Sequence, residues 1–201
     1  MSAGPLTDAE ARVLGCLVEK AMTTPDGYPL TLNALVTACN QRTNRDPVMD
    51  LSDAGVIEAI NGLRDRDLCR LSHAPGGRAV RYLHTVPERL SVDPPAAALL
   101  AVLLLRGSQT PGELRARTAR YHEFSGVAEV EARLGELAGG GLVERLPRRP
   151  GEKEHRWRQL LSGEDAAGEA APEPPGLESR LAVLEERVDR LEALLDRLAG
   201  D

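Results

Sequence analysis

Aromatic side chains are scarce in this 201-residue sequence, which holds three Tyr, one Phe and one Trp. Modules that bind single-stranded nucleic acid stack bases on exposed aromatic rings, so the composition argues against that class. The longest apolar run, Ala96–Leu105, has ten residues. That is half of the ~20 that a helix needs to cross a bilayer. No basic and apolar leader precedes the first predicted helix, and we therefore expect a cytoplasmic protein with no membrane partner.

Cysteine and histidine are also few, with three of the first and four of the second. Their spacing matches neither a disulfide framework nor a metal site. Cys16 and Cys39 fall in apolar helical stretches and Cys69 matches Val143 of the repeat described below, so each is interpreted as a core residue. Because no nucleophile lies beside a base, the sequence predicts no catalytic residue, metal or cofactor, and the protein is not expected to be an enzyme.

The net charge of −6 is concentrated at the C-terminal end of the chain. Residues 1–90 hold 10 Arg and Lys against 11 Asp and Glu, and residues 91–162 hold 11 against 9. Residues 163–201 hold 4 against 11. The first 162 residues are therefore close to neutral, slightly basic in their second half, and the acidity belongs to a tail.

Three helices are predicted in the first 90 residues. Thr7-Asp8-Ala9-Glu10 is a capping box that begins the first helix, and the turn residues 23–27 end it. Thr31 and Ser52 can cap the second and third helices. Apolar residues recur at helical spacing after each of these caps, as expected for helices that bury one face.

A β-hairpin is predicted after the third helix. Residues 68–73 and 79–84 are β-rich and flank Gly76-Gly77, which favours a tight turn. A turn at these glycines places His73 opposite Val80. Three helices closed by a hairpin are typical of a winged helix-turn-helix domain.

The same order then repeats. Residues 96–105 predict a helix buried on most sides, and Thr110-Pro111-Gly112-Glu113 begins the next one. The glycine run 139–141 ends a third helix. Residues 142–146 and 154–160 then form a second predicted hairpin.

The two copies match at a constant offset of 74 residues. This offset aligns apolar positions of the third helix and the hairpin: Val56 with Val130, Ile60 with Leu134, Leu63 with Leu137, and Leu68 with Leu142. We interpret the match as a tandem duplication. The sequence thus predicts a mainly α fold with small β-hairpins, built from winged-helix domains over residues 6–90 and 91–162.

The tail has two predicted parts, a flexible acidic linker over residues 163–176 and a coiled-coil helix over 177–199. Arg180 and Glu185, like Arg187 and Glu192, have opposite charges across two parallel strands, which favours a parallel homodimer. The alternative is that the apolar stripe folds back onto the chain's own domains. The candidate dimerisation residues follow spacings of four and three: Leu181, Leu184, Val188, Leu191, Leu195 and Leu198.

Several segments resemble the YceH-like family of bacterial proteins. The resemblance is carried by residues 11–20 (ARVLGCLVEK), 37–49 (TACNQRTNRDPVM) and 103–115 (LLLRGSQTPGELR), and it covers about residues 6–162. It implies tandem winged helices. Because the family has no established activity, the resemblance implies no catalytic or metal-binding residue.

The polar loop between the second and third helices holds the first candidate site. Side chains of Gln41, Arg42, Asn44 and Arg45 can bond base edges and phosphates, which makes them candidate nucleic-acid contacts. The alternative is that they bond the loop's own backbone and hold the turn.

The third helix of each copy is less suited to DNA. In the first copy its polar positions include Asp53, Glu58 and Asp65, and in the second Glu129, Glu131 and Glu136. Affinity for DNA comes largely from neutralised phosphates, so acidic helices argue against the usual major-groove contact.

The hairpins hold more cations and are candidate wings that contact phosphates or enter a minor groove. The alternative is that these cations are simply solvated. Arg117 and Arg120, on the middle helix of the second copy, could extend the surface. The further candidate contacts are Arg78 and Arg81 on the first hairpin, Arg148, Arg149 and Lys153 on the second, and Arg115 on the middle helix.

Two functional hypotheses follow from the sequence. The first is a DNA-binding protein and transcriptional regulator that dimerises through its tail and contacts duplex DNA with wings and loops. The second is a scaffold on which the winged helices serve as docking modules for a protein partner. The first hypothesis is favoured only by the common association of the winged-helix fold with DNA binding, and the acidic third helices favour the second.

Overall fold

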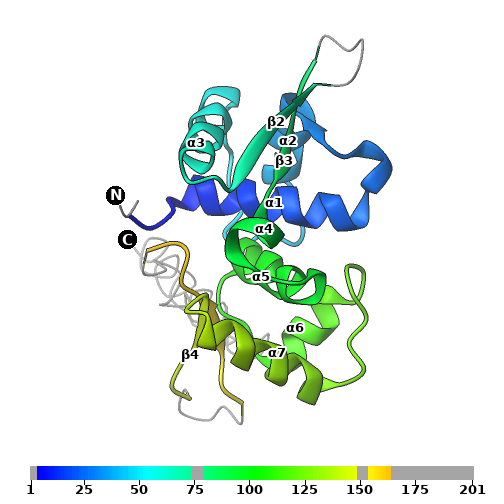
Figure 1. Cartoon of the computed structure of the whole chain (residues 1–201), viewed down its shortest axis with the longest axis vertical. Coiled ribbons are helices and arrows are strands. Elements are labelled where there is room, and N and C mark those ends of the chain that lie inside the picture. Colours follow the sequence, from blue (N-terminus) through cyan, green and yellow to red (C-terminus); the bar gives the residue numbers. More distant parts are fainter. Residues whose placement is uncertain (1–3, 74–78, 149–153, 164–201) are drawn as a thin grey trace, which may run out of the picture. The chain divides into compact units, whose positions relative to one another are not determined.

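The computed structural model of the chain describes residues 4–73, 79–148 and 154–163 (Figure 1). All of them belong to one structural unit, which spans Met1–Gly168. The described part is mainly helical and contains two small antiparallel sheets, as the sequence predicted. None of its helices is long and apolar enough to cross a membrane.

The helices of the first half begin where side chains can cap them. α1 (Asp8–Thr23) begins at Thr7, whose hydroxyl accepts a hydrogen bond from the Glu10 N–H while the Glu10 carboxylate accepts one from the Thr7 N–H. α2 (Leu32–Cys39) and α3 (Asp53–Asp65) begin at the hydroxyls of Thr31 and Ser52. Each cap satisfies an N–H that has no partner within its helix. The three predicted starts are therefore confirmed.

A three-stranded antiparallel sheet closes the first half, with the strand order β1-β3-β2. It consists of β1 (Leu30–Thr31), β2 (Cys69–His73) and β3 (Val80–His84). The register pairs His73 with Val80, as the Gly76-Gly77 turn predicted. The structure also contains a 3-10 turn, η1 (Pro25–Gly27), and a short helix, α4 (Val86–Leu90), which the sequence did not predict.

The second half repeats this order with shorter strands. It contains α5 (Pro94–Arg106), α6 (Pro111–Thr118), α7 (Val127–Gly139), β4 (Val143–Arg145) and β5 (Trp157–Gln159). β4 pairs with β5, and Gln109 forms a bridge to Trp157. Gln109 precedes the second helix of its half, α6, and pairs with the last strand, β5. In the first half β1 likewise precedes α2 and pairs with the last strand, β3, through Leu30 and Tyr82. The two halves therefore share the pairing of their sheets as well as the order of their helices.

Two hydrophobic clusters share α5. Ala97, Ala101, Leu104 and Leu105 pack into a cluster with α1, α2 and α3. Leu99, Leu100, Leu103 and their neighbours pack into a second cluster with α6 and α7. Every side chain from Ala96 to Leu105 is at most 8% exposed, which confirms a helix buried on nearly all sides. Contact on both sides explains why its apolar run has no polar face.

Positions aligned by the 74-residue offset bury the same faces. The matched third-helix residues are all buried: Val56 and Val130, Ile60 and Leu134, Leu63 and Leu137. The three cysteines are buried too, as their core role required. The predicted coiled-coil helix, and all of the predicted linker except Gly163, lie outside the described residues.

Candidate nucleic-acid interface

The outer faces of α3 and α7 are acidic. Asp53, Glu58 and Asp65 are exposed on α3, and Glu131 and Glu136 are exposed on α7. The cation on α7 is already paired, because Arg133 lies 2.8 Å from Glu136 and 3.1 Å from Asp93. The third helices therefore offer few charges that could neutralise phosphates.

Arg45 is committed to the interior. Its side chain is fully buried, and its Nη2 lies 2.5 Å from Oε2 of Glu19, which is buried as well. Its Nε donates to the Ala38 carbonyl at 3.0 Å, and its Nη2 donates to the Gln41 Oε1 at 3.1 Å. Burial disfavours the charged guanidinium, but the hydrogen bonds and charge of Glu19 outweigh it and raise the pKa of Arg45. For Arg45 the geometry supports the loop-holding alternative, so we leave it out of the interface.

Neighbouring loop residues divide between structural and exposed roles. The Asn40 amide donates to the Leu51 carbonyl at 2.9 Å and accepts from the Leu51 N–H at 2.8 Å. Asn44 adopts a left-handed backbone with φ 60°, a conformation that Asn tolerates better than most residues. Arg12 ties down the end of the loop by donating to the Pro47 carbonyl at 2.5 Å. Arg42, by contrast, is exposed.

Glu19 also joins the loop to the second half of the chain. Arg120 Nη2 lies 2.8 Å from Glu19 Oε1, and the Tyr121 hydroxyl donates to the same oxygen at 2.9 Å. Burial favours the neutral acid, yet the hydrogen bonds and charge of Arg45 outweigh it and lower the pKa of Glu19. One ionised carboxylate thus holds cations from both halves.

Further cations meet beside this carboxylate. Arg106, at the end of α5, donates from Nη1 to the Asn44 side-chain oxygen at 3.0 Å. Next to this contact, the Asp46 N–H donates to the Leu105 carbonyl at 2.9 Å. Burial lowers the pKa of Arg117, and the nearby charge of Arg106 lowers it further. We call the group of Asn44, Arg106, Arg117 and Arg120, together with Arg42, which the same loop carries, the junction surface.

The sequence did not predict that the residues of the junction surface lie together. It predicted Arg42 and Asn44 as one candidate and assigned Arg117 and Arg120 to an extension of the second wing. Arg106, in the last turn of α5, was not among the predicted contacts. Because the loop and α6 are about 70 residues apart, no local pattern could show that α5 brings them together.

The remaining predicted contacts are scattered. Arg81 is half-buried and donates to the Pro29 carbonyl at 2.7 Å, and Arg115 is exposed, with Nε 3.4 Å from the Phe124 carbonyl. Arg145, the last residue of β4, and Arg148 are exposed, whereas Arg158 pairs with Glu144 across the second hairpin. Arg78, Arg149 and Lys153 lie outside the described residues.

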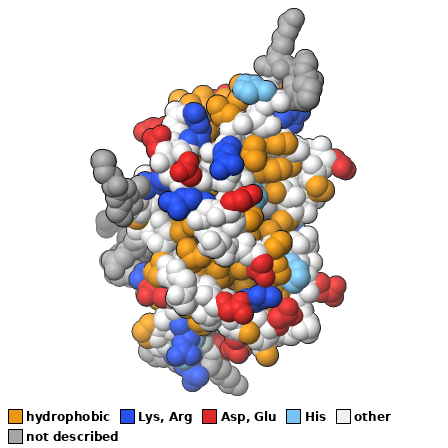
Figure 2. Space-filling view, viewed as in Figure 1, with side chains coloured by type: hydrophobic (Ala, Val, Ile, Leu, Met, Phe, Trp, Pro, Cys, Tyr) orange, Lys and Arg blue, Asp and Glu red, His pale blue; other side chains and the backbone are white. Residues whose placement is uncertain are grey.

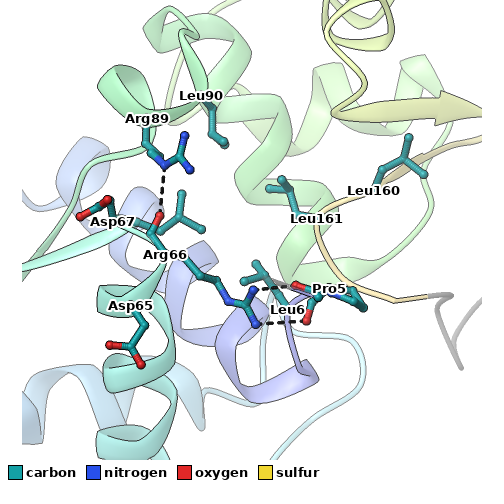
Figure 3. Close-up of a pocket in the computed structure, with 11 residues that line it drawn as sticks. Pro5, Leu6, Asp65, Arg66, Asp67, Arg89, Leu90, Leu160 and Leu161 are labelled. Carbon is teal, nitrogen blue, oxygen red and sulfur yellow. Dashed lines mark hydrogen bonds between the residues drawn. The ribbon is translucent and has the colours of Figure 1, made fainter. Parts of the chain in front are cut away.

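A groove of about 640 Å³ lies apart from these cations, between the N-terminal segment, α4 and the end of β5 (Figure 3). Arg66 crosses it and donates to the Gly4 and Pro5 carbonyls at 2.6 and 3.4 Å. Arg89 Nε donates to the Arg66 carbonyl at 3.1 Å. The lining holds neither Ser, Cys nor His. Within the described residues, no group of three or more His, Cys, Asp or Glu could hold a metal ion.

Comparison with known proteins places the chain in a family. The model of the family described as "Protein of unknown function, DUF480" matches residues 6–152. UPF0502 proteins of Geotalea uraniireducens and Geobacter sulfurreducens are each 50% identical over 191 residues, which cover 93% of this chain and 87% of theirs. One from Paraburkholderia phymatum is 46% identical over 209 residues, covering 98% of this chain and 88% of its own. The predicted membership in a family of unknown function is thereby confirmed: this chain belongs to the DUF480 family, whose named relatives are UPF0502 proteins.

Proposed function

We propose that each half is a winged helix-turn-helix domain and that the protein binds the phosphate backbone of duplex DNA with little sequence preference. The observation that carries the proposal is the repeated arrangement of three helices and a hairpin, with most of its exposed cations away from the acidic third helices. A base-reading helix needs cations or amides at its exposed positions, and α3 and α7 present mainly carboxylates there. Sequence-independent binding asks only for cations at phosphate spacing.

The second wing supplies the first part of the interface. Arg145 and Arg148 are exposed where β4 ends, and the sequence places Arg149 and Lys153 in the same hairpin. Hairpins of this kind can follow a phosphate strand or enter a minor groove. A regulator built this way gains affinity when its tail forms the predicted parallel coiled coil, because a dimer doubles the number of phosphates that it can bind.

The test is binding of a labelled random-sequence duplex, measured over a range of salt concentrations. We expect retention at ~50 mM salt and loss as salt rises. The triple variant Arg148→Ala, Arg149→Ala, Lys153→Ala should lower the slope of log K against log salt by about 0.9 for each phosphate that is no longer neutralised. Arg64→Ala on α3 is the control and should leave the slope unchanged.

A protein-docking scaffold is the second candidate, favoured by exposed apolar side chains. Leu71 on β2 and Val80 on β3 are 39% and 37% exposed, and Ile57 on the acidic α3 is 41% exposed. Because His73 pairs with Val80, Leu71 and Val80 lie on the same face of the hairpin. Figure 2 shows hydrophobic side chains on the upper part of this face, where the hairpin lies, and also across its middle. Absence of duplex binding at ~50 mM salt would favour the scaffold.

A further inference from the structure

We propose that the junction surface is a second phosphate-binding site, so that one DNA backbone contacts both halves of the chain at once. This inference rests on the proposed DNA binding and adds a surface that belongs to neither wing. The site combines the loop after α2 with two segments that are distant from it in sequence, the end of α5, and α6 with the residues that follow it.

Two guanidinium groups of this surface, those of Arg106 and Arg120, are held in place by other side chains. Arg106 is fixed by the Asn44 side chain, and Arg120 by Glu19 and by stacking 5.2 Å above the Tyr121 ring. The Arg120 side chain nevertheless stays 50% exposed, which leaves donors free for an outside acceptor. Cations that are already ordered lose little conformational freedom when they bind a phosphate.

Positive charge exceeds negative charge at the junction. Glu19 is shared by Arg45, Arg120 and, at 3.5 Å, Lys20, so it cannot neutralise the rest. Glu113 binds Arg156 at 3.0 Å and reaches Arg117 only at 3.8 Å.

Asp46 is the other carboxylate near Arg117. The mutual repulsion of Arg106 and Arg117 is relieved by an anion that approaches from solvent.

A polymer fits this surface better than a single small anion. Four guanidinium groups from separate segments offer more donors than the oxygens of one phosphate can accept. The surface is also rigid, because the Asp46 N–H and the Leu105 carbonyl link the loop directly to α5. A regular row of phosphates can contact cations carried on such a fixed backbone with no rearrangement of the loop.

The experiment removes two of the cations with little damage to the fold. Arg42 is exposed and makes no side-chain hydrogen bond within the described residues, and Arg117 has only its long, partly exposed pair with Glu113. The double variant Arg42→Ala, Arg117→Ala should lower the salt slope of duplex binding by about 1.8, at about 0.9 per phosphate. Between ~50 and ~200 mM salt, the wild-type affinity should then fall by about 12-fold more than that of the variant.

The matched control is Arg64→Ala, Arg70→Ala, which removes two exposed arginines from α3 and β2. It should keep the wild-type slope, and both variants should keep the wild-type melting temperature. If the chain binds duplex but the junction variant keeps the wild-type slope, this inference is overturned and the proposed function stands. If the wild-type chain does not bind duplex at ~50 mM salt, the proposed function and this inference fail together.

Discussion

Replacing Glu19 by Ala should destabilise the protein more than any single change at its surface. The carboxylate accepts from Arg45 Nη1 and Nη2, from Arg120 Nη2 and from the Tyr121 hydroxyl. Arg120 reaches solvent once Glu19 is gone, but Arg45 stays buried with an uncompensated charge. Breaking a buried ion pair in this way costs about 3–5 kcal/mol.

Urea unfolding measures this free energy directly, provided that the slope against urea concentration is unchanged. Arg120→Ala is the internal control. It removes the half-exposed partner of the same carboxylate and should cost no more than about 1 kcal/mol. The double variant Glu19→Leu, Arg45→Met removes both buried charges and should cost less than Glu19→Ala alone.

This reasoning is refuted if the double variant loses as much unfolding free energy as Glu19→Ala, or more. Arg45 would then be stabilised by its carbonyl acceptors and not by the charge of Glu19. If Glu19→Ala and Arg120→Ala lowered the free energy of unfolding equally, burial would not determine how strongly the ion pairs of Glu19 stabilise the protein.

Three further outcomes are expected. Gly15→Ala places a Cβ 2.8 Å from the Leu105 Cγ and should lower the free energy of unfolding by about 1–3 kcal/mol. In the control Gly135→Ala the new Cβ meets open space, and the free energy of unfolding should rise by about 0.5–1 kcal/mol. Equal melting temperatures of the two variants would contradict the close approach of α1 and α5. Because the folded state lowers the pKa of Glu19, its contribution is present above the unfolded value of about 4.3 and is lost as pH falls below it. Glu19→Gln should therefore flatten the acid decline of the unfolding free energy, and an unchanged decline would assign it to other groups. Light scattering should find a dimer for the intact chain and a monomer for a chain ending at Ser162, and two equal masses would exclude the tail as the dimerisation element.

Local chemistry explains what the sequence could predict. The capping box of Thr7 and Glu10 and the register of His73 with Val80 depend on residues within a few positions or on one tight turn. Helix α4 escaped prediction because five residues show no periodicity and its N-cap, Thr85, makes no side-chain capping bond.

Long-range pairs explain what the sequence could not predict. Glu19 and Arg45 are 26 residues apart, and Glu19 and Arg120 are 101 apart. A lone Glu at the end of an apolar helix has the same local pattern whether it is solvated or buried. Only the packing of α5 against α1 determines that this carboxylate faces both the loop and the second half.

The sharing of α5 between two hydrophobic clusters has a consequence for how the chain unfolds. A fragment that ends at Leu90 would leave the side of α1 that contacts α5 open to water, and the remaining fragment would expose Ala97, Ala101, Leu104 and Leu105. If either half unfolds, buried apolar side chains of the other half become exposed to water. The two halves are therefore expected to melt in one cooperative step, so that unfolding of one of them removes both from the folded population.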